Sequence, residues 1–134
     1  VPARGELMMS RSQLRQLRAA GAEIGAHTHT HPILEGLTDE QALAEIAAGK
    51  LEVESILGET VTVFAYPNGV PGRDYSVRHR KMVEKLGFVG AVSTEPRFAN
   101  VKADPFQLPR FTPWDRTPQR FAVRCLMQLW NSGG

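Results

Sequence analysis

Three of the chain's four histidines, His27, His29 and His31, lie within the segment EIGAHTHTHP, residues 23–32. Neutral imidazole is a good ligand for Zn²⁺, and a catalytic zinc site normally has three protein ligands and one open position. Histidines at this density therefore predict a metal site. The pairs 27/29, 29/31 and 27/31 all stay open, because an extended chain points all three side chains one way whereas a bend can bring the outer two together.

The histidine spacing differs from that of the helical zinc proteases. Pro32 disfavours helical geometry at His31, and the protease motif needs a glutamate after its first histidine, where this chain has Thr28. A carboxylate should complete the metal site, but spacing does not select one. The acidic candidates for this ligand are Asp39, Asp74, Glu95, Asp104 and Asp115. The alternative to a metal site is a polar turn whose histidines bind nothing.

The rest of the chain alternates between helix and strand patterns. Thr38 and Gln41 match a capping box, and the apolar spacing after them is helical as far as Gly58. Alternation with short joins predicts parallel strands with crossover helices, in an α/β sheet or an incomplete barrel. Helices are expected at about 12–20, 38–58, 76–86 and 117–130, and strands at about 23–26, 61–66, 88–93 and 106–111.

Chemically useful side chains follow the expected strands. His27, Tyr66, Ser93 and Arg110 each lie at or just beyond the carboxyl end of one of them. Ligands collect at the carboxyl ends of parallel strands in α/β folds. These four residues are therefore predicted to share one rim.

Composition narrows the class of protein. With 134 residues, 42% apolar and 22% charged, the chain reads as at most one globular domain, residues 1–134. The net charge is only +2 and the basic residues lack interleaved aromatics, so no nucleic-acid partner is expected. No apolar run has membrane-spanning length. The sequence leaves the localisation open; a cell-envelope or extracytoplasmic place would require a signal in a preceding segment.

Two of these segments resemble motifs of the polysaccharide deacetylases, carbohydrate esterase family four. EIGAHTHTHP is similar to the family's second motif, His-Ser/Thr-x-x-His. FAYPNG, residues 64–69, is similar to its third motif, in the variant where Phe-Ala-Tyr-Pro replaces Phe-Arg-Pro-Pro. The segments LRQLRAAGAEIGAHT, LTDEQALAEI and LGFVGAVST also fit, so the resemblance runs from about Met8 to Arg116.

The resemblance implies a distorted or incomplete (β/α) barrel with parallel strands. It also implies a metal-dependent hydrolase that removes acetyl groups from the N-acetylated sugars of a polysaccharide or oligosaccharide. His27 and His31 would be the metal ligands, with Zn²⁺ the expected divalent ion. Thr28 would hold the loop by hydrogen bonding, and His29 would be a variable position between the ligands.

The third motif carries over to the substrate side of the site. The backbone N–H near Asn68 would stabilise the oxyanion, while Tyr66 and Pro67 would shape the substrate pocket. Ala65 stands where the family's third motif has an arginine, and Arg110 is a candidate for its orienting role. Trp114 could stack on a sugar or pack within its loop.

The chain also departs from the family pattern. The first motif, Thr-Phe-Asp-Asp-Gly, is absent, so the catalytic base and third metal ligand are expected before Val1. The Leu-x-His motif of the general acid is missing too; His79 is expected on a solvated helix face and Trp130 in the core. The chain is therefore interpreted as a C-terminal portion of a catalytic domain, inactive alone.

Two other functions stay open. One is a non-catalytic glycan-binding domain with a vestigial metal site, which an upstream sequence without an Asp-Asp pair would favour. The other is a metal-dependent amide hydrolase of small molecules, which a closed pocket would favour over a groove.

Overall fold

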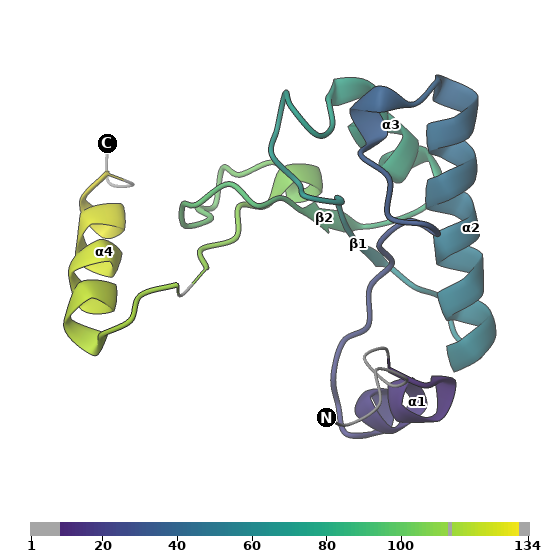
Figure 1. Ribbon diagram of the computed structural model, residues 1–134, viewed down its shortest axis with the longest axis horizontal. Coiled ribbons are helices and arrows are strands. Elements are labelled where there is room, and N and C mark those ends of the chain that lie inside the picture. Colours follow the sequence, from purple (N-terminus) through teal and green to yellow (C-terminus); the bar gives the residue numbers. More distant parts are fainter. Residues whose placement is uncertain (1–8, 113, 132–134) are drawn as a thin grey trace, which may run out of the picture.

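The computed structural model describes residues 9–112 and 114–131. In Figure 1 the strands and the helices beside them pack together, with the first helix at one end of this body and the last helix standing away from it. The elements in order are α1 (Arg11–Ala19), η1 (Leu34–Gly36), α2 (Asp39–Leu57), β1 (Val63–Ala65), α3 (Val77–Lys85), β2 (Gly90–Val92), η2 (Pro105–Gln107) and α4 (Pro118–Asn131).

The strands form a parallel array in chain order. β1 pairs with β2 in parallel, with Phe64 opposite Ala91. Isolated parallel bridges extend the array on both sides, joining Ala26 to Phe64 and Val92 to Leu108. Because α2 and α3 connect neighbouring parallel segments, the prediction of an α/β fold with crossover helices is confirmed. The described residues do not close into a barrel.

The helices begin and end close to where the sequence predicts them, whereas the strands are shorter than predicted. Thr38 and Gln41 form the expected capping box of α2, which ends at Gly58 in the left-handed conformation, φ 73°. The strand expected at 23–26 is reduced to the bridge at Ala26. In the segment 106–111 only Leu108 pairs, because the Asp104 side chain accepts a hydrogen bond from the Phe106 N–H and starts the 3₁₀ turn η2.

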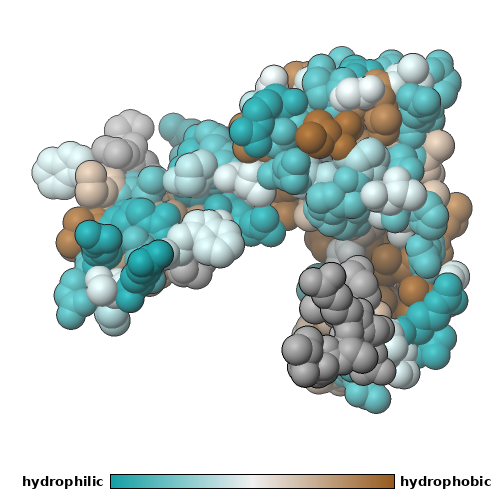
Figure 2. Space-filling view, viewed as in Figure 1, coloured by the Kyte–Doolittle hydropathy of each residue, from teal (hydrophilic) through white to brown (hydrophobic). Residues whose placement is uncertain are grey.

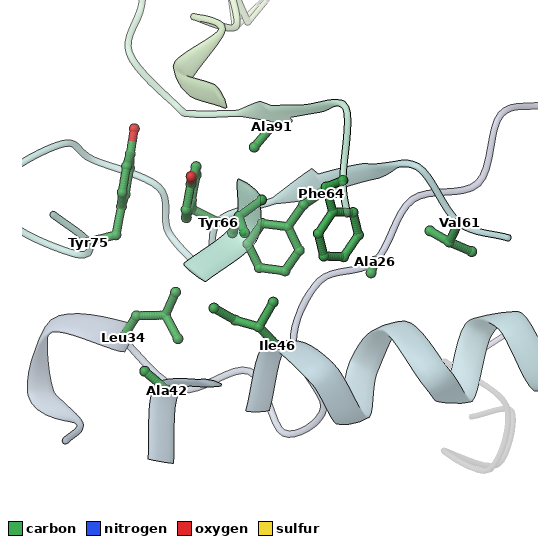
Figure 3. Close-up of a cluster of buried hydrophobic side chains, with 11 residues drawn as sticks. Ala26, Leu34, Ala42, Ile46, Val61, Phe64, Tyr66, Tyr75 and Ala91 are labelled. Atoms are coloured by element: carbon green, nitrogen blue, oxygen red, sulfur yellow. The ribbon is translucent and has the colours of Figure 1, made fainter. Parts of the chain in front are cut away.

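The core lies between the parallel array and α2 (Figure 3), where Ile46 and Leu34 face the side chains of β1. Tyr66 and Tyr75 stack with ring centroids 3.7 Å apart and planes 2° apart. The Tyr66 hydroxyl donates to the Phe106 carbonyl at 3.0 Å, which satisfies its polar end within the core. Burial raises the pKa of Tyr75 to about 12, so this hydroxyl stays protonated at neutral pH.

His79 lies in the core, so its expected place on a solvated face is wrong. The residue is fully buried at the third position of α3. Its Nδ1 accepts a hydrogen bond from the Ser76 N–H at 3.1 Å, the role that glutamate or glutamine has in a capping box. The Glu35 carboxylate of η1 lies 3.5 Å from the same nitrogen. A helix-capping role, rather than solvent, therefore explains this histidine.

Folding should become less favourable in mild acid because of His79. Burial lowers its pKa below 6.5, and the positive charge of Arg78 adds to this effect. The unfolded chain binds a proton near pH 6.5 that the folded chain resists, so the free energy of unfolding falls as pH drops below that value. His79→Gln keeps the cap but cannot titrate. Urea unfolding at about pH 7.5 and about pH 5.5 should show a smaller decrease in this variant; equal decreases would contradict the prediction.

α4 presents an apolar face to solvent. Trp130 was expected in the core but is 88% exposed, because the helix does not pack on the parallel array (Figure 1). Figure 2 shows apolar side chains at the surface of this helix. Arg124 attaches α4 to the preceding loop through Asp115 and the Thr112 carbonyl. Among the described residues, no helix is both long and apolar enough to cross a membrane.

Candidate functional site

The loops that leave the parallel array meet along one edge. His27 follows the bridge at Ala26, and its Nδ1 lies 2.7 Å from the Ala65 carbonyl at the end of β1. The Thr94 hydroxyl, after β2, donates to the Asn68 carbonyl at 2.6 Å. These contacts join neighbouring loops at the carboxyl ends of their strands, where the shared rim was predicted.

The last segment of the rim is joined in the same way. The Arg110 N–H donates to the Glu95 carbonyl at 3.1 Å, two residues beyond the bridge at Leu108. The Ser93 N–H donates to the Leu108 carbonyl at 2.8 Å. All four predicted rim segments are therefore linked, each to the next.

The outer two histidines are brought together by a bend. The ring centroids of His27 and His31 lie 4.8 Å apart, edge to face. Thr28 and His31 have left-handed backbone conformations, φ 57° and 62°, which β-branched residues such as threonine adopt only when the surroundings require it. Of the three pairs that the sequence left open, the structure favours 27/31.

The middle histidine belongs to a different contact. The Nδ1 of His29 lies 3.2 Å from the Glu52 carboxylate of α2, and the side chain is about half exposed (49%). His29 thus pairs with the helix rather than with the other two rings. This separation agrees with the variable position that the family resemblance implied for it.

His27 has the hydrogen bonding of a metal-binding histidine. Because the Ala65 carbonyl can only accept, Nδ1 carries the proton and Nε2 keeps its lone pair. Metal-binding histidines characteristically donate their second nitrogen in this way, which fixes the tautomer and the ring orientation. Two imidazoles fit Zn²⁺, and no cluster of three or more potential ligands occurs among residues 9–112 and 114–131. The described part of the chain therefore brings together two imidazoles that could hold a metal ion.

None of the acidic candidates joins the histidines. Each is paired with an arginine: Asp39 with Arg78, Asp74 with Arg73, Glu95 with Arg97, Asp104 with Arg80, and Asp115 with Arg124. Asp74 shows the effect most clearly, since Arg73 lowers the pKa of its buried carboxyl below the ordinary value. These carboxylates maintain loops and helix ends.

Asn68 presents its backbone at the turn after β1. Its φ is 55°, its side chain is exposed, and its N–H donates to no group in the described part of the chain. Gly69 follows with φ 74°, and a Cβ there would lie 3.1 Å from the Thr94 nitrogen. This tight turn fixes the direction of the free N–H, which can donate to an oxyanion.

The other proposed substrate residues divide into buried and exposed ones. Tyr66 and Pro67 are buried, so they can shape the site only by supporting the turn from within the core. Thr28 is also buried and donates its hydroxyl to the His27 carbonyl at 2.6 Å. Arg110 is exposed, with no guanidinium partner among the described residues, and Trp114 is 82% exposed.

Besides Glu52, two residues of α2 contact the backbone of the histidine loop, residues 27–31, and sequence reasoning missed both. Glu45 accepts hydrogen bonds from the backbone of the loop. Gly49 lies so close that an added Cβ would be 2.9 Å from Thr28 Cα and closer still to the Thr28 carbonyl. A glycine inside a helix, four residues after a glutamate and so on the same face, was the available signal.

Comparisons with known proteins agree with the motifs. The family described as "Polysaccharide deacetylase" matches residues 4–91. YxkH of Bacillus subtilis strain 168, assigned to the polysaccharide deacetylases, is 30% identical over 92 residues, 69% of this chain and 32% of its own. Chitin deacetylase 1 of Cryptococcus neoformans is 30% identical over 91 residues, 67% of this chain and 18% of its own.

The fold has solved counterparts as well. The Streptococcus pyogenes deacetylase PplD, solved in complex with acetate, superposes with a TM-score of 0.77 at 20% identity, covering 92% of this chain and 52% of that one. At this identity the match establishes the fold alone. The chain spans about a third or less of the curated relatives it matches.

Proposed function

Since the chain belongs to the polysaccharide deacetylase family, we propose that it is part of a metal-dependent hydrolase that removes acetyl groups from N-acetylated sugars of a polysaccharide or oligosaccharide. The observation that carries this proposal is the pair His27 and His31, whose ring centroids lie 4.8 Å apart at the carboxyl edge of a parallel array. The left-handed backbone of Thr28 and His31 brings the two imidazoles together at a cost in strain. Strained conformations of this kind cluster at functional sites, which supports a functional role for the pair.

His27 and His31 would hold the metal, with Zn²⁺ the ion that suits two imidazoles. When bound, such an ion polarises an acetyl carbonyl and lowers the pKa of a bound water. The protein's part is orientation: the Ala65 carbonyl fixes the His27 tautomer, and the Thr28 hydroxyl stabilises the bend between the ligands.

The substrate side follows from the next loops of the rim. The free N–H of Asn68 would donate to the oxyanion formed when the acetyl carbonyl is attacked. Tyr66 and Pro67 would support that turn from the core. Arg110 would orient a polar group of the site, and Trp114 would stack on a sugar ring.

The residues named above do not include a third metal ligand, a general base or a general acid. Every acidic candidate of the described chain is engaged by an arginine, and His79 is buried in the core. We propose that a longer protein, of which residues 1–134 would be a C-terminal portion of the catalytic domain, supplies these three groups.

Acetate release tests this function. The longer protein, loaded with zinc, should release acetate from oligomers of N-acetylglucosamine, while the 134-residue chain alone should release none. His27→Ala in the longer protein should lower the rate by roughly a hundredfold or more, because the metal is lost. An unchanged rate in His27→Ala would contradict the proposal.

A glycan-binding domain without catalysis is the second candidate, favoured by the exposure of Trp114. It predicts oligosaccharide binding by the longer protein that Trp114→Ala abolishes, without acetate release under any metal condition.

A further inference from the structure

We infer that Glu45, on α2, is a positioning residue for the histidine pair: its carboxylate holds the loop between His27 and His31 in the bend that brings their rings together. The role of this bend in metal binding rests on the proposed function. The hold of Glu45 on the loop does not, and it can be measured without metal.

The carboxylate of Glu45 contacts the middle of the loop three times. Oε2 accepts from the N–H of His29 at 3.0 Å and from the N–H of Thr30 at 2.8 Å, and Oε1 accepts from the Thr30 hydroxyl at 2.8 Å. Burial alone would raise the pKa of this carboxyl, but the hydrogen bonds from Thr30 and His29 keep it below its ordinary value. The acceptor is therefore ionised at neutral pH, which strengthens these bonds.

The bend leaves backbone amides of the loop without hydrogen-bond partners, and the Glu45 carboxylate accepts from them. Left-handed residues at Thr28 and His31 turn the chain sharply at both ends of the loop, so the amides between them find no partner within regular structure. Glu45 supplies that partner from one turn of α2. Gly49, one turn later, lets the Thr28 carbonyl lie directly against the helix.

The two histidine rings differ in what orients them. His27 is fixed from β1 by the Ala65 carbonyl. His31 is exposed, its ring lies edge to face with the ring of His27, and it makes no side-chain hydrogen bond or ion pair with the described residues. The position of His31 therefore depends on the backbone immediately before it, at Thr30, which is the residue that Glu45 holds most closely.

The test compares Glu45→Ala and Glu45→Gln with Glu40→Ala as the matched control. Glu40 is an exposed glutamate of the same helix without a contact to the loop, so its loss removes the same charge. Two quantities are measured: hydrogen exchange of the His29 and Thr30 amides without metal, and zinc affinity by calorimetry. Glu45→Ala should speed exchange at both amides and weaken zinc binding about tenfold or more.

The conservative variant separates positioning from general destabilisation. Glu45→Gln keeps one oxygen acceptor and should restore part of both the exchange protection and the affinity, whereas Glu40→Ala should match the parent chain. Zinc affinity within about twofold of the parent in Glu45→Ala would overturn the inference. If the parent chain binds no zinc, the longer protein with the third ligand is titrated in its place, and no binding there defeats the proposed function. The inference about Glu45 is then decided by amide exchange alone: unchanged exchange in Glu45→Ala overturns it.

Discussion

Gly49→Ala should destabilise the protein by roughly 2–3 kcal/mol, although alanine is the better helix former. In an open helix this replacement stabilises by about 1 kcal/mol. Here the new Cβ would lie 2.9 Å from Thr28 Cα, with the Thr28 carbonyl closer still. The obstructing atoms are backbone, so no side-chain rotation relieves the overlap. Either α2 or the histidine loop must move.

Gly36→Ala is the matched control for this prediction. Gly36 is exposed, has no positive φ, and an added Cβ would meet nothing within 4 Å. Chemical unfolding of the two variants should therefore give a large loss for Gly49→Ala and a change within about 0.5 kcal/mol for Gly36→Ala. A Gly49→Ala variant as stable as the parent would show that the loop and α2 are not in close contact.

Helix ends were predictable because their signals are local. Thr38 and Gln41 bond each other's backbone across three residues, and Gly58 accepts a left-handed conformation that other residues resist. The rim was predictable for a similar reason, since alternation of helices and strands dictates which chain segments share an edge. Neither prediction required knowledge of the tertiary contacts.

The choice of histidine pair required tertiary information. Threonine strongly disfavours the conformation that Thr28 adopts, so a local reading prefers an extended loop with all three histidines aligned. The contacts that reverse this preference come from α2, where Glu45 and Gly49 are separated from the loop by more than a dozen residues. A glutamate on a helix is usually solvated, and the one local sign of a contact at Glu45 is the glycine one turn later, Gly49.

His79 and Trp130 were misjudged for opposite reasons. A histidine within a charged helix predicts exposure, but this one caps the helix by bonding the Ser76 N–H and is covered by η1. An apolar stripe on a helix predicts burial, but α4 meets the loop before it through Phe121 and Arg124 at Phe111 and leaves Trp130 exposed. Both residues show that amphipathic patterns predict which face of a helix is apolar, not what covers it.

Loss of either outer histidine should weaken zinc binding far more than loss of the middle one. His27→Ala and His31→Ala each remove one of the two proposed ligands, so we expect the affinity to fall by on the order of a hundredfold or more. His29→Ala removes an imidazole that faces Glu52 rather than the pair, and its affinity should stay within about threefold of the parent. Calorimetric titration of the three variants under one buffer condition makes the comparison.

Each result of this titration has a distinct structural meaning. Because His29 contributes its backbone N–H to Glu45, and alanine keeps that N–H, the His29→Ala loop should retain its bend. A loss in His29→Ala equal to that in the other two variants would therefore contradict the 27/31 pairing, since it would mean that zinc draws the loop into the extended form with aligned histidines. Equal binding by all three variants would contradict a histidine site altogether. Selective loss in His27→Ala and His31→Ala would establish that the strained bend, held by α2, exists to place two ligands on one metal.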